Sequence, residues 1–268
     1  PGESDDTFLF NAHNCHPFQA NDDASGMAVG IELMRRLQQK NNRKFTYQLL
    51  IAPELFGTMF WSDSLPPAQI SNLRGTVMLK SVGNSRALRL QQSFDPKSLV
   101  GRAANSTFQS KYGEFDSGVF RSIYGNDETV FESPPYQIPS ISLTRWPFDE
   151  YHSNLDTPDR LLEDSLQDTL DTALSICEEL EAAGSYFPRF TGVPNLSRHN
   201  LYKSLPFSGD SPDYKCVGGR WHRLMNTLPS LLGSGLIINE TAKEFELPAS
   251  EITEYLQRWI DAGLVEKR

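Results

Sequence analysis

Two histidines, a cysteine and two aspartates lie close together between residues 11 and 26. They are His13, Cys15, His16, Asp22 and Asp23. The segment follows the short apolar run 8–10 and leads into residues 25–40, whose apolar positions repeat at helical spacing. We therefore expect these side chains at the carboxyl end of a strand, where open α/β sheets bind ligands. Imidazoles and carboxylates this close together indicate a zinc site.

Other loops supply further side chains of the same kinds. His152 lies in a polar loop, Glu54 follows the strand pattern at 45–51, and Asp127 precedes the strand pattern at 138–144. A hydrolytic zinc site needs about three His, Asp or Glu ligands, and a carboxylate can serve as its general base. The sequence contains no phosphate-binding glycine loop and no Gly-x-Ser-x-Gly elbow. Metal-assisted hydrolysis is therefore the chemistry best provided for.

Cys15 permits a second interpretation, as a nucleophile with His16 or His152 as its base. Neighbouring side chains on an extended segment point in opposite directions, so Cys15 and His16 should not face each other. We expect Cys15 to be a small buried residue under the site. Asp23 is expected to cap the helix that follows it.

Strand and helix patterns alternate along the first two thirds of the chain. Strand patterns occupy residues 8–10, 45–51, 75–82, 87–91 and 138–144, and helix patterns occupy 25–40, 96–109 and 159–183, the last with Leu161 and Leu162 on its buried side. This alternation predicts an α/β fold, a three-layer α/β/α sandwich.

The last third of the chain has a different pattern. We predict a first domain at 1–190, a linker or wrapping arm rich in Pro, Gly and Ser at 191–214, and a small module at 215–268. Helix patterns in the module suggest a winged helix, with a core made of Trp221, Leu228, Leu232, Tyr255, Leu256 and Trp259.

Composition and charge narrow the function classes. The 268 residues are 38% hydrophobic and 22% charged, and the net charge of −9 argues against a nucleic-acid partner. No apolar run approaches the ~18–20 residues that span a bilayer, so no membrane is expected. Three cysteines fit a reducing, cytoplasmic setting. Because the chain begins at Pro1 and enters a strand almost at once, we expect the amino-terminal part of the first domain to be missing.

Winged helices often bind DNA through a basic recognition helix. Residues 215–268 carry seven basic and seven acidic side chains, and residues 249–262 have three acidic residues against one arginine. This balance favours a docking module for a protein partner or a second copy of the chain over a DNA-binding regulator.

Several segments together resemble known proteins. Residues 21–26 (Asn-Asp-Asp-Ala-Ser-Gly), Glu54 after a strand, and residues 151–153 (Tyr-His-Ser) resemble zinc aminopeptidases of the M28 type. Residues 13–17 (His-Asn-Cys-His-Pro) and 124–128 (Tyr-Gly-Asn-Asp-Glu) resemble an aminopeptidase-like subfamily that has a carboxyl-terminal winged helix and is associated with bacterial polysaccharide biosynthesis. The likeness covers nearly the whole chain.

The resemblance implies a fold of the zinc-aminopeptidase (phosphorylase/hydrolase-like) type and specific roles. Asp22 matches an aspartate that bridges two zinc ions, and His152 matches a zinc-binding histidine. His13 and His16 both match the first histidine ligand, and this choice stays open. Asp127 would bind metal or hydrogen-bond a ligating histidine.

Two departures from the family pattern bear on the metal count. Glu54 matches the general base, but Leu55 stands where a second, ligating glutamate is expected. Asn84, or the pair Lys80 and Ser81, stands where a ligating aspartate is expected. One zinc ion is therefore expected rather than two. The resemblance implies a zinc-dependent amide hydrolase acting on a small peptide or an amino-sugar amide, and the alternative is a non-catalytic metal-binding scaffold.

Overall fold

The computed structural model describes residues 1–183, 186–203 and 216–267. Contacts within the chain divide it into two compact units, Pro1–Glu178 and Glu179–Arg268. The first unit contains the polar segments singled out above.

A six-stranded sheet forms the centre of the first unit, with the strand order β2-β1-β3-β6-β4-β5. β1 pairs in parallel with β2 and β3, β3 pairs in parallel with β6, and β4 is antiparallel to β6. The strands are β1 Thr7–His13, β2 Thr46–Ala52, β3 Leu73–Lys80, β4 Arg89–Gln91, β5 Ser117–Gly118 and β6 Ser140–Thr144.

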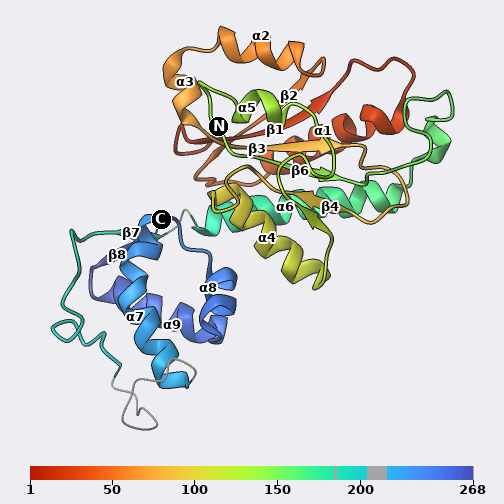
Figure 1. Cartoon of the computed structure of the whole chain (residues 1–268). Coiled ribbons are helices and arrows are strands. Elements are labelled where there is room, and N and C mark those ends of the chain that lie inside the picture. The colour runs from red at the N-terminus through yellow and green to blue at the C-terminus, as the bar shows by residue number, and fades with distance from the viewer. Residues whose placement is uncertain (184–185, 204–215, 268) are drawn as a thin grey trace. The chain divides into compact units, whose positions relative to one another are not determined.

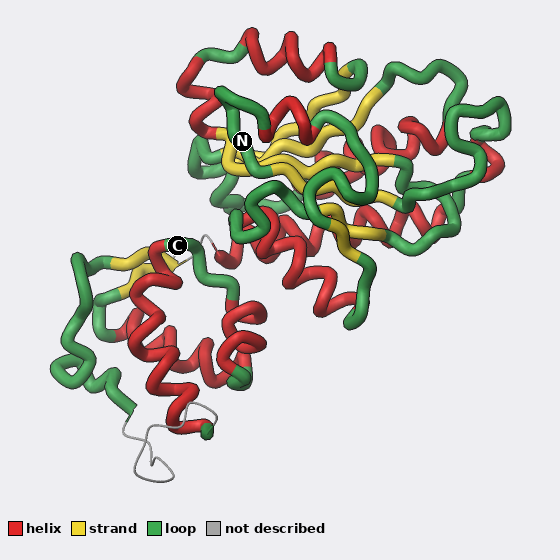
Figure 2. The backbone as a smooth tube through the Cα atoms, in the orientation of Figure 1, coloured by secondary structure: helices red, strands yellow, loops and turns green. Residues whose placement is uncertain are grey.

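Helices cover both faces of this sheet. They are α1 Ser25–Gln38, α2 Phe56–Ser64, α3 Pro67–Asn72, α4 Leu99–Tyr112, α5 Glu128–Glu132 and α6 Glu163–Ala183. In Figure 1, α2, α3 and α5 lie on one side of the strands, and α4 and α6 lie on the other. Figure 2 shows the same arrangement, with the yellow strands between two groups of red helices. The predicted three-layer α/β/α sandwich is confirmed.

Side chains of β1 alternate between the two faces of the sheet. Leu9 belongs to a buried cluster with Met78 and Phe131. Phe8 points the opposite way and meets the ring of Phe45 edge-on, with 5.1 Å between ring centroids. Burial on both faces explains why the strand reads as a continuous apolar run rather than an alternating one.

Helix α6 begins at Glu163, four residues later than the pattern predicted. A short 3-10 turn at Pro158–Arg160 precedes it. The backbone N–H of Leu162 donates to the carbonyl of Gly83, which holds this part of the chain against the loop after β3 and outside the helix. The expectation that Leu162 lies on the buried side of the helix is wrong, since it is 43% exposed.

The second unit consists of helices and one small antiparallel sheet. Its elements are β7 Tyr186–Pro188, α7 Val217–Gly233, α8 Ile238–Phe245, α9 Ala249–Asp261 and β8 Val265–Lys267. All six predicted core residues belong to one buried cluster, which confirms that expectation. Because β7 pairs with β8, residues 186–188 belong with this unit although the predicted first domain runs to 190. Residues 204–214 of the predicted linker lie outside the described residues.

No helix among the described residues is both long enough and apolar enough to span a membrane.

Candidate metal centre

Three neighbouring parallel strands place polar side chains at one edge of the sheet. His13 ends β1 and pairs with Ala52 at the end of β2. Asn11 lies opposite Met78 in the pairing of β1 with β3, so His13 and Lys80, two residues further along each strand, reach the same level. β1 lies between β2 and β3, so the chain reverses its direction of winding at this edge. Such switch points at the carboxyl ends of strands are where open α/β sheets bind ligands.

Asp156 holds the loop between β1 and α1 in place. Its carboxylate oxygens accept hydrogen bonds from the backbone N–H groups of Asn21, at 2.6 Å, and Asp22, at 3.0 Å. This contact joins the Asp22 segment to the loop that carries His152, about 130 residues away in the sequence. Sequence reasoning missed Asp156, since nothing in its local pattern distinguishes it from other loop aspartates.

Asp23 ties the sheet edge to the first helix. Oδ1 accepts from the backbone N–H groups of Gly26, at 3.2 Å, and Ser81, at 2.9 Å, and Oδ2 accepts from that of His13, at 3.3 Å. Burial raises the pKa of Asp23 to about 7. Asp23 was predicted to cap the helix. Its carboxylate does accept from Gly26 in α1, and it also connects that helix with the end of β1 and the residue after β3.

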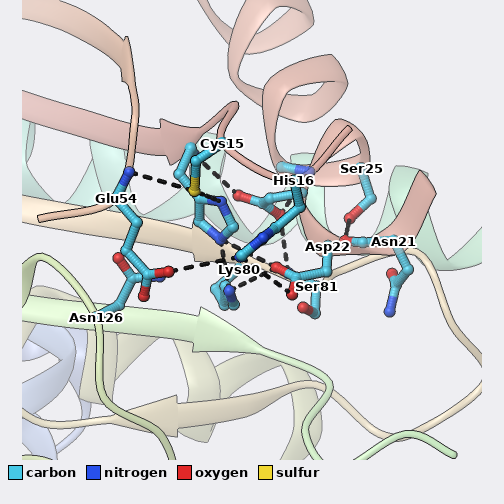
Figure 3. Close-up of polar contacts among 12 residues, drawn as sticks. Cys15, His16, Asn21, Asp22, Ser25, Glu54, Lys80, Ser81 and Asn126 are labelled. Carbon is cyan, nitrogen blue, oxygen red and sulfur yellow. Dashed lines mark hydrogen bonds and ion pairs between the residues drawn. The ribbon is translucent and has the colours of Figure 1, made fainter. Parts of the chain in front are cut away.

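The structure brings five of the six predicted site residues together. Two groups of side chains have possible ligand atoms within 4.8 Å of one another, and both include His16. Figure 3 shows His16 together with Cys15, Asp22 and Glu54 of these groups. One group is His13, Cys15, His16 and Glu54, and the other is His16, Asp22 and His152.

The second group has atoms available to bind a metal. Asp22 Oδ2 lies 3.2 Å from His152 Nε2 and 3.8 Å from His16 Nε2. Asp22 Oδ2 and His16 Nε2 are buried and form no hydrogen bond within the described part of the chain. Burial lowers the pKa of His16, which favours the neutral imidazole that a metal needs.

The first group has atoms already engaged. Cys15 Sγ accepts from the backbone N–H of Glu54 at 3.4 Å and lies 3.5 Å from His13 Nδ1. Burial raises the pKa of the Cys15 thiol, which disfavours the thiolate that zinc binds and that a nucleophile requires. We expected Cys15 to be buried, but in the structure it is only half-buried.

Lys80 occupies the buried side of Asp22. Its Nζ lies 2.5 Å from Asp22 Oδ1 and 2.5 Å from His13 Nε2. Burial raises the pKa of Asp22, but the contacts with His13 and Lys80 outweigh burial and hold that pKa well below its usual range. Asp22 is therefore a carboxylate at neutral pH. Sequence reasoning did not assign Lys80 a role, although a single lysine ending an apolar strand was a usable signal.

Asp127 lies apart from both ligand groups. Its Oδ1 accepts from the backbone N–H of Leu55 at 2.5 Å, and its Oδ2 accepts from Thr58 Oγ1 at 2.7 Å. Both carboxylate oxygens are thus engaged at the start of α2. The structure does not support the expectation that Asp127 binds metal or a ligating histidine, because it gives this carboxylate different partners.

The His152 imidazole packs against aromatic rings. The imidazole stacks on the Tyr151 ring, with 3.8 Å between centroids and 19° between planes. The Tyr151 hydroxyl lies 3.0 Å from that of Tyr124. His152 is itself 47% exposed, so its ring is fixed while its edge stays open to solvent.

Asn84 points away from the centre. Its Nδ2 donates to the carbonyls of Ser81 and Arg145, each at 3.2 Å. Of the residues considered for the position of a ligating aspartate, Lys80 is the one whose side chain reaches Asp22.

A polar cavity of about 480 Å³ lies beside the loops that carry the centre. Its wall includes Asn21 and Glu150, which precede Asp22 and His152 by one and two residues. The remaining wall is mostly polar or charged and includes Arg86, Asp149, Asp156, Asp159 and Arg160.

Residues 1–183 match the model of a protein family that is described as a domain of unknown function, DUF4910. The chain belongs to the DUF4910 family. The match covers all of the predicted site residues.

Two proteins from Clostridium acetobutylicum are similar to this DUF4910 chain. One is provisionally named a polysaccharide biosynthesis protein with an aminopeptidase-like domain, and it is 26% identical over 216 residues, 79% of this chain and 49% of the relative. The other is a crystal structure provisionally named a peptidase, with a TM-score of 0.71 and 20% identity over 100% of this chain and 58% of that one. The DUF4910 chain thus spans about half the length of these relatives.

Solved aminopeptidases share the fold of about two thirds of the chain. An aminopeptidase from Aneurinibacillus sp. strain AM-1 has a TM-score of 0.57 at 23% identity, over 66% of this chain and 44% of that one. A zinc aminopeptidase from Bacillus subtilis has a TM-score of 0.56 at 20% identity, over 65% and 46%. These likenesses show that the fold is aminopeptidase-like.

Proposed function

We propose that this chain is a zinc-dependent amide hydrolase of the M28 aminopeptidase type. The observation that carries the proposal is the convergence of Asp22 Oδ2 and His16 Nε2, both buried and without a hydrogen bond in the described part of the chain, on His152 Nε2. Leaving buried polar atoms unpaired costs about 1–3 kcal/mol each, and a bound metal ion removes that cost.

The spacing of these atoms suits zinc. Ligand atoms of a tetrahedral zinc site with bonds of about 2.0–2.1 Å lie about 3.3 Å apart. Asp22 Oδ2 lies 3.2 Å from His152 Nε2 and 3.8 Å from His16 Nε2, and Glu54 Oε2 lies 3.6 Å from His16 Nε2. In this proposal His16, Asp22 and His152 would hold one zinc ion, and Glu54 lies next to His16 at the same site.

When bound, zinc acts as a Lewis acid that makes water nucleophilic near neutral pH and polarises a carbonyl group. In this proposal Glu54 would accept a proton from the attacking water and pass it to the leaving amine. Its side chain is 21% exposed, so its carboxylate can reach solvent and substrate. Its backbone is held on both sides, by Cys15 Sγ at its own N–H and by Asp127 at the N–H of Leu55.

The substrate class is a polar amide, either an amino-terminal peptide bond or an amide on an amino sugar. The name of the relative, which combines polysaccharide biosynthesis with an aminopeptidase-like domain, supports the amino-sugar choice.

One observation favours a second candidate, a metal-binding scaffold without catalysis. Leu55, next to the base, offers no ligand atom where the aminopeptidases have a second glutamate. In that case His16, Asp22 and His152 would hold zinc as a structural ion.

For the second unit we propose a winged-helix-like docking module. Residues 215–268 carry seven basic and seven acidic side chains, so the sequence of this unit has no excess of positive charge. The absence of a basic excess, together with three acidic residues against one arginine in residues 249–262, disfavours DNA and favours a protein partner or a second copy of the chain.

Zinc content and amide turnover of the purified chain test the proposed hydrolase. The assay panel contains aminoacyl p-nitroanilides and N-acetylated amino sugars, and the variants are Glu54→Gln and the exposed-loop control Glu114→Gln. We expect bound zinc in all three proteins and a loss of about 10²–10⁴-fold in kcat for Glu54→Gln only. Bound zinc without turnover of any amide would favour the scaffold, and a chain that binds no zinc contradicts both.

A further inference from the structure

Lys80 stands at the centre of a buried group of polar atoms. Its side chain is 1% exposed, and Nζ lies 2.5 Å from both Asp22 Oδ1 and His13 Nε2, which are themselves 3.0 Å apart. Burying an ammonium group is costly unless it is paired and hydrogen-bonded. Here the pairing is with a carboxylate that also faces the proposed zinc.

The two oxygens of Asp22 face two different sets of side chains. Oδ2 faces His16 and His152, whereas Oδ1 faces Lys80 and His13. A carboxylate with an imidazole on each side is arranged as in centres where two metal ions lie about 3.5–4 Å apart. In this chain a positive charge already occupies one of the two places.

We propose that the Lys80 ammonium is a built-in cation that takes the place of a second metal ion and limits the centre to one divalent ion. The proposal rests on the proposed function for the zinc at His16, Asp22 and His152. Lys80 neutralises Asp22 Oδ1 and fixes the carboxylate, so that Oδ2 is presented to the metal. It is a positioning residue, and His13 is a partner of Lys80 rather than a ligand.

Contacts with Lys80 and Asp22 exclude His13 from metal binding. His13 Nε2 lies 2.5 Å from Lys80 Nζ and 3.0 Å from Asp22 Oδ1, so this nitrogen is already in contact with both groups. The other ring nitrogen, Nδ1, lies 3.5 Å from Cys15 Sγ. Neither ring nitrogen of His13 is left for a metal ion.

Aromatic contacts hold the ammonium where a metal would otherwise sit. Lys80 Nζ lies 4.6 Å from the centroid of the Tyr124 ring, within range of a cation–π interaction. The Tyr124 hydroxyl meets that of Tyr151, whose ring stacks on His152. One chain of contacts therefore positions both the built-in cation and a proposed zinc ligand.

Zinc counting on the full chain tests this proposal. Wild type, Lys80→Asp, His13→Gln and the double variant Lys80→Asp/His13→Gln are loaded with zinc, dialysed and analysed for metal per chain by mass spectrometry. Lys111→Met is the control, because Lys111 is another lysine paired with an aspartate, Asp168, although its side chain is 28% exposed and lies outside the centre. Circular dichroism and thermal melting report whether each variant is folded.

We expect one ion in the wild type, one in His13→Gln, one in Lys111→Met, two in Lys80→Asp and one in the double variant. Two ions in the wild type, a folded Lys80→Asp that keeps one ion, or loss of the ion in His13→Gln would each overturn the proposal. If Lys80→Asp does not fold, two ions in the wild type or loss of the ion in His13→Gln would still overturn the proposal. A wild type without zinc contradicts the proposed function, and a single ion gained by Lys80→Asp would then still support the role of Lys80. If neither the wild type nor Lys80→Asp binds zinc, the result would overturn both the proposed function and the proposed role of Lys80.

Discussion

Asp127 Oδ1 accepts a 2.5 Å hydrogen bond from the backbone N–H of Leu55, the residue directly after Glu54. Leu55 has a backbone φ of 60°. Residues other than glycine adopt such a conformation at a cost of about 1–3 kcal/mol. Asp127 is fully buried, and its other oxygen binds Thr58. The contact therefore holds the strained turn that presents Glu54.

Replacing Asp127 tests this role against metal binding. Asp127→Ala leaves the Leu55 N–H and the Thr58 hydroxyl without their buried acceptor, which should cost about 2–4 kcal/mol in the free energy of unfolding. We expect the zinc content to stay unchanged and kcat to fall, as judged by urea unfolding, metal analysis and the amide assay. The exposed Asp5→Ala is the control, and loss of zinc in Asp127→Ala alone would show that Asp127 belongs to the metal site.

His16 and His152 should both be required for zinc. Each supplies one nitrogen close to Asp22 Oδ2, so removing either leaves only two of the three proposed ligands. His16→Ala and His152→Ala should weaken zinc binding by on the order of 100-fold or more, measured by competition with a chelating dye. His199→Ala, in the second unit, should bind zinc like the wild type. Equal affinity in all four proteins would refute the ligand assignment.

Glu128 makes stability depend on pH. Burial raises the pKa of Glu128 to about 7, although its carboxylate accepts from the backbone N–H of Asn126. Between about pH 4.5 and 7 the folded chain therefore keeps a proton that the unfolded chain has lost, and stability falls as pH rises through this window. The full effect is on the order of 3 kcal/mol, and it levels off above pH 7.

Glu128→Gln removes this titrating group. The free energy of unfolding of the variant relative to wild type should increase steadily from pH 5 to pH 7, as measured by urea unfolding at fixed ionic strength. The exposed Glu114→Gln should follow the wild-type curve. Parallel curves for wild type and Glu128→Gln would show that Glu128 does not carry the proton.

Local patterns were sufficient to predict the layers of the fold and the side chains gathered at the sheet edge. The apolar strands and the start of α1 are encoded in short stretches, and the carboxyl ends of parallel strands meet at one edge by geometry. The same reasoning placed His16, Asp22, His152 and Glu54 near one another, although their roles are still proposals.

Long-range pairing was not predictable from those patterns. The resemblance placed Lys80, with Ser81, as an alternative to Asn84 at the position of a ligating aspartate, but it assigned Lys80 no contact. Only the register of β1 with β3 shows that Lys80 reaches Asp22. The sequence identified Asp127 as a loop carboxylate near the site. Only the tertiary structure shows that its two oxygens accept hydrogen bonds from Leu55 and Thr58. Helix α6 was predicted too early because a backbone contact with Gly83, rather than the leucine spacing, sets its start.

The identity of the zinc ligands is the most direct test of the account. X-ray absorption at the zinc edge of the loaded wild-type chain distinguishes nitrogen and oxygen neighbours at about 2.0–2.1 Å from sulfur at about 2.3 Å. We predict two imidazole nitrogens with oxygen neighbours and no sulfur, as His16, Asp22 and His152 require. A sulfur neighbour would instead assign the ion to the group that contains Cys15 and would contradict the proposed centre.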